Sequence, residues 1–119
     1  MKLVIAIIRP ERLDAVQEEL RRVLDEQDNY RITIDTVQGH GRQHGDVEYM
    51  RGQPVQPRLV TKVRVMVAVN DPYVDRTIEA ICEGARTAGD GAVGDGKIMV
   101  MPLEDVIRIR TGERGPKAI

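Results

Sequence analysis

The segment Lys62–Asn70, "KVRVMVAVN", carries the clearest structural signal in the chain. Valines stand at positions 63, 65, 67 and 69 and alternate with Lys62, Arg64, Met66 and Ala68. Alternation with a period of two is typical of a β-strand, and valine favours that conformation. The pattern predicts a strand over residues 62–70, and the rest of the fold is built outward from it.

The segments after this strand predict a helix, a loop and two further strands. Asp71-Pro72 opens the helix, whose apolar residues recur at helical spacing: Val74, Ile78, Ile81, Cys82 and Ala85. A glycine-rich loop follows over residues 89–96, and "KIMVMP" over residues 97–102 is a short apolar strand. The alternation "VIRIRTG" over residues 106–112 predicts one more strand.

The segments before it complete the fold. "KLVIAIIR" over residues 2–9 and "RITIDTVQG" over residues 31–39 predict strands, and residues 10–24 carry helical spacing behind Pro10. The order β-α-β-β-α-β predicts an α+β, ferredoxin-like double βαβ fold, with an antiparallel sheet and both helices on one face. The 119 residues suit one domain, 1–119, with a C-terminal strand and tail over 103–119.

The connection between the second and third strands is longer than adjacent antiparallel strands need. It spans residues 39–61, and a loop of roughly twenty residues in a compact domain usually has a function. Its glycines and prolines exclude a hidden helix: Gly39, Gly41, Gly45, Gly52, Pro54 and Pro57. We expect a mobile interaction loop.

Composition excludes several classes of function. Hydrophobic residues make up 41% of the chain, which suits a globular protein with an aliphatic core. The formal net charge is −1, so neither nucleic acid nor a membrane surface is an expected partner. No signal peptide or membrane-length apolar run is evident, so we expect a cytoplasmic protein. The single cysteine excludes a disulfide within the chain.

The stretch "GAVGDGKI" over residues 91–98 matches the first seven positions of the P-loop pattern and then fails. Ile98 stands where Ser or Thr should hold magnesium. The element order is also reversed, because a helix precedes the glycines and a strand follows them. A Walker-type nucleotide hydrolase is therefore rejected.

An anion site of another kind survives that rejection. Consecutive N–H groups in a glycine-rich turn can form a nest for an anion, and Lys97 adds a positive charge. Arg108 and Arg110 alternate along the predicted last strand and suit bidentate phosphate binding. Lys62 and Arg42 are further cations. The alternative is a tight turn beside a solvated arginine pair.

Three motifs, together with the start of the chain, resemble one family. "AIIRPERLDAV", "GRQHG", "VGDGKI" and "VIRIRTGERG" stand in the order and at the element boundaries found in the PII signal-transduction proteins, the P-II nitrogen regulators. The resemblance covers nearly the whole chain. It implies a homotrimer of double-βαβ subunits, with three nucleotide sites between subunits where ATP and ADP compete.

The resemblance also implies site residues, with no catalytic residue among them. Phosphates would be cradled by Gly94, Asp95, Gly96 and Lys97. Arg108 and Arg110 would reach the phosphates, one of them from the neighbouring subunit. Gly41, Arg42 and Gln43 would face the nucleotide, and Ile7 and Thr33 would lie near the adenine. In the family 2-oxoglutarate binds beside Mg-ATP, so Gln43 would help hold Mg2+ and Lys62 would pair with the effector's carboxylate, reordering the long loop.

The chain departs from the family in that loop. Val55 stands where a tyrosine usually accepts a nucleotidyl group, Gln53 where some members carry a phosphorylated serine, and Met50 at another common tyrosine. No modification is therefore expected at the usual tyrosine position. Tyr49, one residue away, is either a shifted acceptor or a partner contact.

Three further features bear on partner and ligand. Arg51 matches an arginine that some members insert into an ammonium channel, which makes it a second candidate for partner contact. Met66 replaces a common glutamate near the adenine, and the loop before "GDGK" is about two residues longer than usual, so the preference between ATP and ADP is open.

The leading hypothesis is a non-enzymatic regulator that senses ATP or ADP, with 2-oxoglutarate, and controls a partner such as an ammonium channel or a metabolic enzyme. The alternative within the family is a carboxysome-associated type that binds ADP or AMP with bicarbonate. A slow ATPase lacks an evident nucleophile and base. A metal-binding trimer would use His40 and His44, whose other interpretation is two solvated loop residues.

Overall fold

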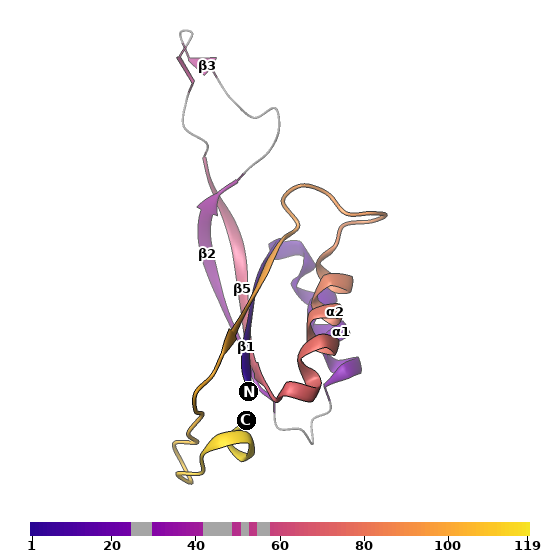
Figure 1. Ribbon diagram of the computed structural model, residues 1–119. Helices are drawn as coiled ribbons and strands as arrows, with labels where there is room; N and C mark the ends of the chain where they lie inside the picture. The colour runs from indigo at the N-terminus through magenta and orange to yellow at the C-terminus, as the bar shows by residue number, and fades with distance from the viewer. Residues whose placement is uncertain (25–29, 42–48, 51–52, 55–57) are drawn as a thin grey trace.

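The computed structural model describes residues 1–24, 30–41, 49–50, 53–54 and 58–119. Its centre is a four-stranded antiparallel sheet in the order β2-β5-β1-β6. The strands are β1 Lys2–Ile8, β2 Ile32–His40, β5 Leu59–Val69 and β6 Gly96–Pro102. Helices α1 (Leu13–Val23) and α2 (Val74–Ala85) both lie on one face of this sheet (Figure 1). The predicted ferredoxin-like fold is confirmed.

The core lies between the sheet and the helices and is aliphatic. All four valines at odd positions of β5 from Val63 to Val69 are buried, as the alternation in that strand predicted. Val4, Ala6 and Ile8 of β1 pack with them. The helices contribute Val16, Leu20 and Ile81, which are at most 1% exposed.

Each helix begins with a proline-containing 3-10 turn, η1 over Pro10–Arg12 and η3 over Asp71–Tyr73. Proline fixes its own φ near the helical value, which suits the first turn. The two helices then approach closely at Gly84, where a Cβ would lie 2.6 Å from the Cα of Val16. Arg12 adds a tether, because its Nε donates to the Gly84 carbonyl over 2.8 Å.

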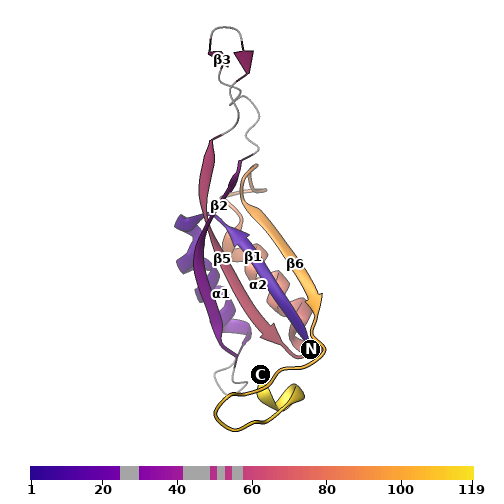
Figure 2. The ribbon, with the colours of Figure 1, turned by 90° about the vertical axis from the view of Figure 1, so that its left-hand side faces the viewer.

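The other face of the sheet is covered by neither α1 nor α2, and Figure 2 looks onto it. Strand register places Asp35, Arg64, Ile7 and Lys97 in one row across this open face. Arg64 donates to both carboxylate oxygens of Asp35, over 2.9 and 2.5 Å. Further along the edge strand β6, the apolar side chains of Met99 and Met101 are 40% and 50% exposed.

The long connection is shorter at both ends than the sequence predicted. β2 and β5 stay paired as far as His40 and Leu59, because β5 begins three residues before Lys62. Between them, β3 (Tyr49–Met50) pairs with β4 (Gln53–Pro54) as a small antiparallel ladder. The rest of the predicted loop, residues 42–48, 51–52 and 55–57, lies outside the described residues.

The predicted strand over residues 106–112 is wrong. These residues, all of them described, form a turn that is closed by a single bridge between Ile107 and Arg114. Gly112 and Gly115 take φ angles of +71° and +77°, which reverse the chain where a strand would have continued. Asp105 fixes the turn by accepting from Arg114 Nε over 2.8 Å and from the Gly115 N–H over 3.0 Å. A short 3-10 helix, η4 (Gly115–Ala118), ends the chain.

Candidate functional site

The connection between α2 and β6, residues 86–95, is here called the glycine loop. It lies at the end of the sheet where β1 ends, since Ile8 pairs with Gly96 on one side and Val63 on the other. Gly89, Gly91 and Gly94 have φ angles of +83°, +88° and +99°. L side chains rarely adopt such angles, so the glycines set the path of the loop.

Two cations from the sheet hold three consecutive residues of this loop. Lys62 Nζ donates to the Gly94 carbonyl over 2.6 Å. Arg9 Nη2 donates to the Val93 carbonyl over 2.8 Å, and Arg9 Nε donates to Asp95 Oδ1 over 3.1 Å. Arg9 follows β1 and Lys62 lies near the start of β5, so the antiparallel pairing of these strands brings both cations under the loop.

Asp95 ties the loop to itself. Its Oδ2 accepts from the N–H of Ala92 over 2.9 Å, and from the N–H and hydroxyl of Thr87 over 3.2 and 3.3 Å. The pKa of Asp95 is lowered from 3.8 to about 2. The hydrogen bond from the Ala92 amide is the largest cause, desolvation opposes it, and the Thr87 amide and Arg9 add to the lowering. The carboxylate organises the loop that was expected to cradle phosphates.

Gly96 begins β6 at a place where only glycine fits. A Cβ on this residue would lie 1.7 Å from the carbonyl oxygen of Ile7, and its φ is +111°. The next residue, Lys97, pairs with Ile7 in the strand register and therefore stands on the open face. The close contact between the backbones of β6 and β1 places Lys97 beside the glycine loop.

This arrangement suits a phosphate group. Arg9, Lys62 and Lys97 bring three positive charges to a glycine-rich turn that itself carries the carboxylates of Asp90 and Asp95. Glu11 lies 3.9 Å from Arg9 Nη1. Backbone N–H groups of such turns are good hydrogen-bond donors to a bound anion. Among the residues that the structure describes, no group of three His, Cys, Asp or Glu side chains is placed to hold a metal ion.

The other predicted residues near this end of the sheet are placed as follows. Thr33 pairs with Met66 and is exposed on the open face. Gly41 follows β2, and a Cβ there would lie 2.9 Å from a methyl group of Val60. His40 is the exposed last residue of β2. Arg42, Gln43, His44, Arg51 and Val55 lie outside the described residues, and Tyr49 is described only as part of β3.

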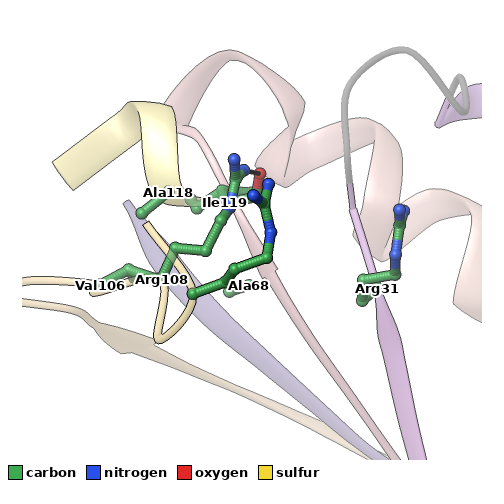
Figure 3. Close-up of a pocket in the computed structure, with 7 residues that line it drawn as sticks. Arg31, Ala68, Val106, Arg108, Ala118 and Ile119 are labelled. Carbon is green, nitrogen blue, oxygen red and sulfur yellow. Dashed lines mark hydrogen bonds between the residues drawn. The ribbon is translucent and has the colours of Figure 1, made fainter. Parts of the chain in front are cut away.

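Arg108 and Arg110 lie at the opposite end of the sheet. They line a cavity of about 500 Å³ together with Arg31, Ala68, Val106, Ala118 and Ile119. Arg108 is held by the end of its own chain: its Nη2 donates to the Ile119 carbonyl over 3.5 Å (Figure 3) and to the Lys117 carbonyl over 3.1 Å. Its Nη1 lies 3.5 Å from Glu113 Oε1. Ala68 and Lys62 are six residues apart on β5, about 20 Å along a strand, so a single chain does not bring these arginines to the glycine loop.

Arg9 is the contributor that sequence reasoning missed. The sequence pattern places it only at the end of the first strand. A usable signal existed, because the ferredoxin-like order places the end of the first strand beside the starts of the third and fourth. A cation at that position faces whatever loop leads into the fourth strand.

Comparison with known proteins gives a consistent result. The family model described as nitrogen regulatory protein P-II matches residues 1–113. The chain is 50% identical over 119 residues to nitrogen regulatory protein GlnK1 of Methanosarcina mazei, covering 100% of this chain and 97% of that protein. It is 44% identical over 119 residues to nitrogen regulatory protein P-II of Azospirillum brasilense, covering 100% of both.

A solved structure agrees in fold. The crystal structure of Arabidopsis thaliana PII bound to citrate matches with a TM-score of 0.76 and 37% sequence identity, covering 99% of this chain and 91% of that chain. In the described part of this chain, no helix is both long enough and apolar enough to cross a membrane.

Proposed function

Since the chain belongs to the nitrogen regulatory protein P-II family, we propose that it is a non-enzymatic signal-transduction regulator that binds ATP or ADP. The glycine loop is the phosphate site of this proposal, and the observation that carries it is the set of cations around that loop. Lys62 donates to the Gly94 carbonyl and Arg9 to the Val93 carbonyl, and Lys97 stands on β6 just after the loop. A Cβ on Gly94 would lie 3.1 Å from Arg9 Nη2, so glycine at this position leaves room for the cations beneath the turn.

The site is completed in this proposal by a neighbouring copy in a homotrimer. Arg108 and Arg110 are too far from the glycine loop of their own chain to contact the same nucleotide, but a second copy can supply them. The open face of the sheet supports oligomerisation, because its exposed Met99 and Met101 are apolar and lie on an edge strand. Uncovered apolar patches of this kind usually mark interfaces.

Effector sensing uses the same end of the sheet. We assign the pairing with a carboxylate of 2-oxoglutarate to Lys62, whose ammonium group now donates to the Gly94 carbonyl. Gln43 would supply an oxygen to Mg2+ beside the ATP phosphates, which a hard cation prefers. Binding there would reorder the loop over residues 39–61, through which a partner protein is controlled.

Calorimetric titration tests the proposal. ATP, ADP and AMP are titrated alone, then with Mg2+ and 2-oxoglutarate, and then with bicarbonate. The proposal expects 2-oxoglutarate to bind only in the presence of Mg-ATP. Binding of ADP or AMP that responds to bicarbonate, without any response to 2-oxoglutarate, would favour the carboxysome-associated type. If the wild-type protein binds no adenine nucleotide, the proposed function fails.

A further inference from the structure

We propose that Arg9 is a positioning residue for the phosphate site: by holding Val93 and Asp95, it turns the amide of Gly94 outward, toward the phosphate of a bound nucleotide. The proposal rests on the proposed function of the glycine loop. Arg9 need not touch the nucleotide for this role, because it acts through the loop.

The geometry of the peptide unit gives the argument its direction. In a trans peptide the carbonyl oxygen and the following N–H point in opposite directions. The Val93–Gly94 peptide is trans, and Arg9 Nη2 holds the Val93 carbonyl over 2.8 Å. The Gly94 N–H is therefore turned away from Arg9. Lys62 holds the carbonyl of the next peptide, Gly94–Asp95, in the same way. The N–H of that peptide, on Asp95, donates to the Ala92 carbonyl over 3.2 Å and closes a turn.

Arginine is suited to this task in a way that lysine is not. Its planar guanidinium carries donors in a fixed fork, so one side chain can hold two acceptors at a set separation. Here the two acceptors, the Val93 carbonyl and Asp95 Oδ1, lie on either side of Gly94. The fork therefore fixes the residue between them.

The backbone of Arg9 is itself anchored, so the fork has a rigid base. Its carbonyl accepts from the Arg12 N–H over 3.0 Å, in the 3-10 turn that Pro10 begins. The Arg9 side chain is 21% exposed, and Asp95 is 19% exposed. Contacts of this kind are less screened than those on an open surface.

Positioning matters because glycines make this loop intrinsically free. A loop with several positive-φ glycines has many conformations to lose when it binds a ligand. A preformed loop avoids that loss at the moment of binding. The benefit falls on ligands whose phosphates reach the loop, so ATP gains more from Arg9 than AMP does.

The test compares Arg9→Gln, Arg9→Lys and Arg12→Gln with the wild-type protein. Arg12→Gln is the matched control, because it removes a neighbouring arginine whose Nε also donates to a backbone carbonyl, on α2. Amide hydrogen exchange over residues 92–95 is measured without ligand, and the affinities for ATP and AMP are measured by calorimetry.

We expect exchange over residues 92–95 to rise about tenfold or more in Arg9→Gln, on the scale of one or two charge-assisted hydrogen bonds. ATP affinity falls by about tenfold and AMP affinity by much less. Arg9→Lys recovers part of the ATP affinity, and Arg12→Gln changes neither exchange nor the ratio of ATP to AMP affinity.

Equal losses for ATP and AMP, unchanged exchange in Arg9→Gln, or the same pattern in Arg12→Gln would overturn the inference. The exchange measurement needs no nucleotide. If wild-type protein binds no nucleotide at all, the proposed function fails, while exchange still decides whether Arg9 orders the loop.

Discussion

Lys62 donates a hydrogen bond from Nζ to the carbonyl oxygen of Gly94 over 2.6 Å, joining the start of β5 to the glycine loop 32 residues later. Lys62, which we propose pairs with the carboxylate of 2-oxoglutarate, thus already holds the glycine loop, which we propose binds the phosphates. The ammonium group has three N–H donors, so a ligand's carboxylate would share Lys62 with the Gly94 carbonyl. The two halves of the proposed site are coupled through this one contact.

Replacement of Lys62 by methionine should separate effector binding from nucleotide binding. Lys62→Met removes the ammonium group, and we expect the affinity for 2-oxoglutarate in the presence of Mg-ATP to fall about tenfold or more, the scale of a charge-assisted hydrogen bond. The affinity for ATP in the absence of 2-oxoglutarate should fall less, because Arg9 still holds the glycine loop. Calorimetry measures both affinities.

The control for that variant is Lys2→Met, which removes a lysine at the far end of the same sheet. It should leave both affinities within about twofold of wild type, since screening weakens charge effects at that separation. Equal losses of ATP and 2-oxoglutarate affinity in Lys62→Met would contradict the assignment of Lys62 to the effector.

Gly96 should tolerate no side chain. Gly96→Ala places a Cβ 1.7 Å from the Ile7 carbonyl oxygen at a φ of +111°, so β6 must shift away from β1. We expect a loss of about 3 kcal/mol in the free energy of unfolding, the range of severe backbone clashes. Urea denaturation followed by circular dichroism measures it.

Gly89→Ala is the matched comparison, because Gly89 has a positive φ of +83° and no atom lies within 4 Å of the position that a Cβ would take. Only conformational strain applies there, and we expect a loss of about 1 kcal/mol. Equal losses in the two variants would mean that the contact between β6 and β1 does not restrict Gly96.

Asp95 should stabilise the fold in a pH-dependent way. Its pKa is lowered from 3.8 to about 2, so folding favours the ionised form. The stabilisation is fully present above the unfolded-state pKa near 3.8 and is lost as pH falls toward 2. We expect the difference in melting temperature between wild type and Asp95→Asn to be constant from pH 5 to 7 and to shrink from about pH 4 to about pH 2.

That comparison cancels the other acidic groups with lowered pKa values, Asp35, Asp71 and Asp105, because both proteins retain them. Differential scanning calorimetry at matched ionic strength gives the melting temperatures. A difference that stays constant down to pH 2 would show that the Asp95 carboxylate gains nothing from its partners in the loop.

Much of this molecule follows from sequence periodicity. The valines of β5 and the helical spacing of residues 74–85 report burial directly, so the fold and core were predictable. The turn over residues 106–112 was not, because "VIRIRTG" alternates like a strand while its path is set by Gly112, Gly115 and contacts to Asp105. Arg9 was missed because its role depends on which loop lies above the end of β1, a tertiary relationship.

The candidate site was predictable only in its parts. Glycine spacing identified the loop, and Lys97 beside it follows from strand register. The separation of Arg108 from that loop could not be read from alternation, which reports the face of an element but not the end of the sheet at which it lies. The resemblance to P-II proteins supplied the expectation that a neighbouring subunit resolves this separation.

The central claim is a nucleotide site shared between two copies of the chain, and complementation between inactive variants tests it most directly. Lys97→Gln and Arg108→Gln are each expected to abolish ATP binding in their own homotrimers. Unfolding the two together and refolding them at equal amounts creates mixed trimers. Sites that combine an intact Lys97 from one subunit with an intact Arg108 from its neighbour should then form about a quarter of the total, by random assortment in a cyclic trimer. Recovery of ATP binding to that level is the result we predict. Mixed trimers, verified by native mass spectrometry, that bind no more ATP than the separate variants would contradict a site built from two subunits.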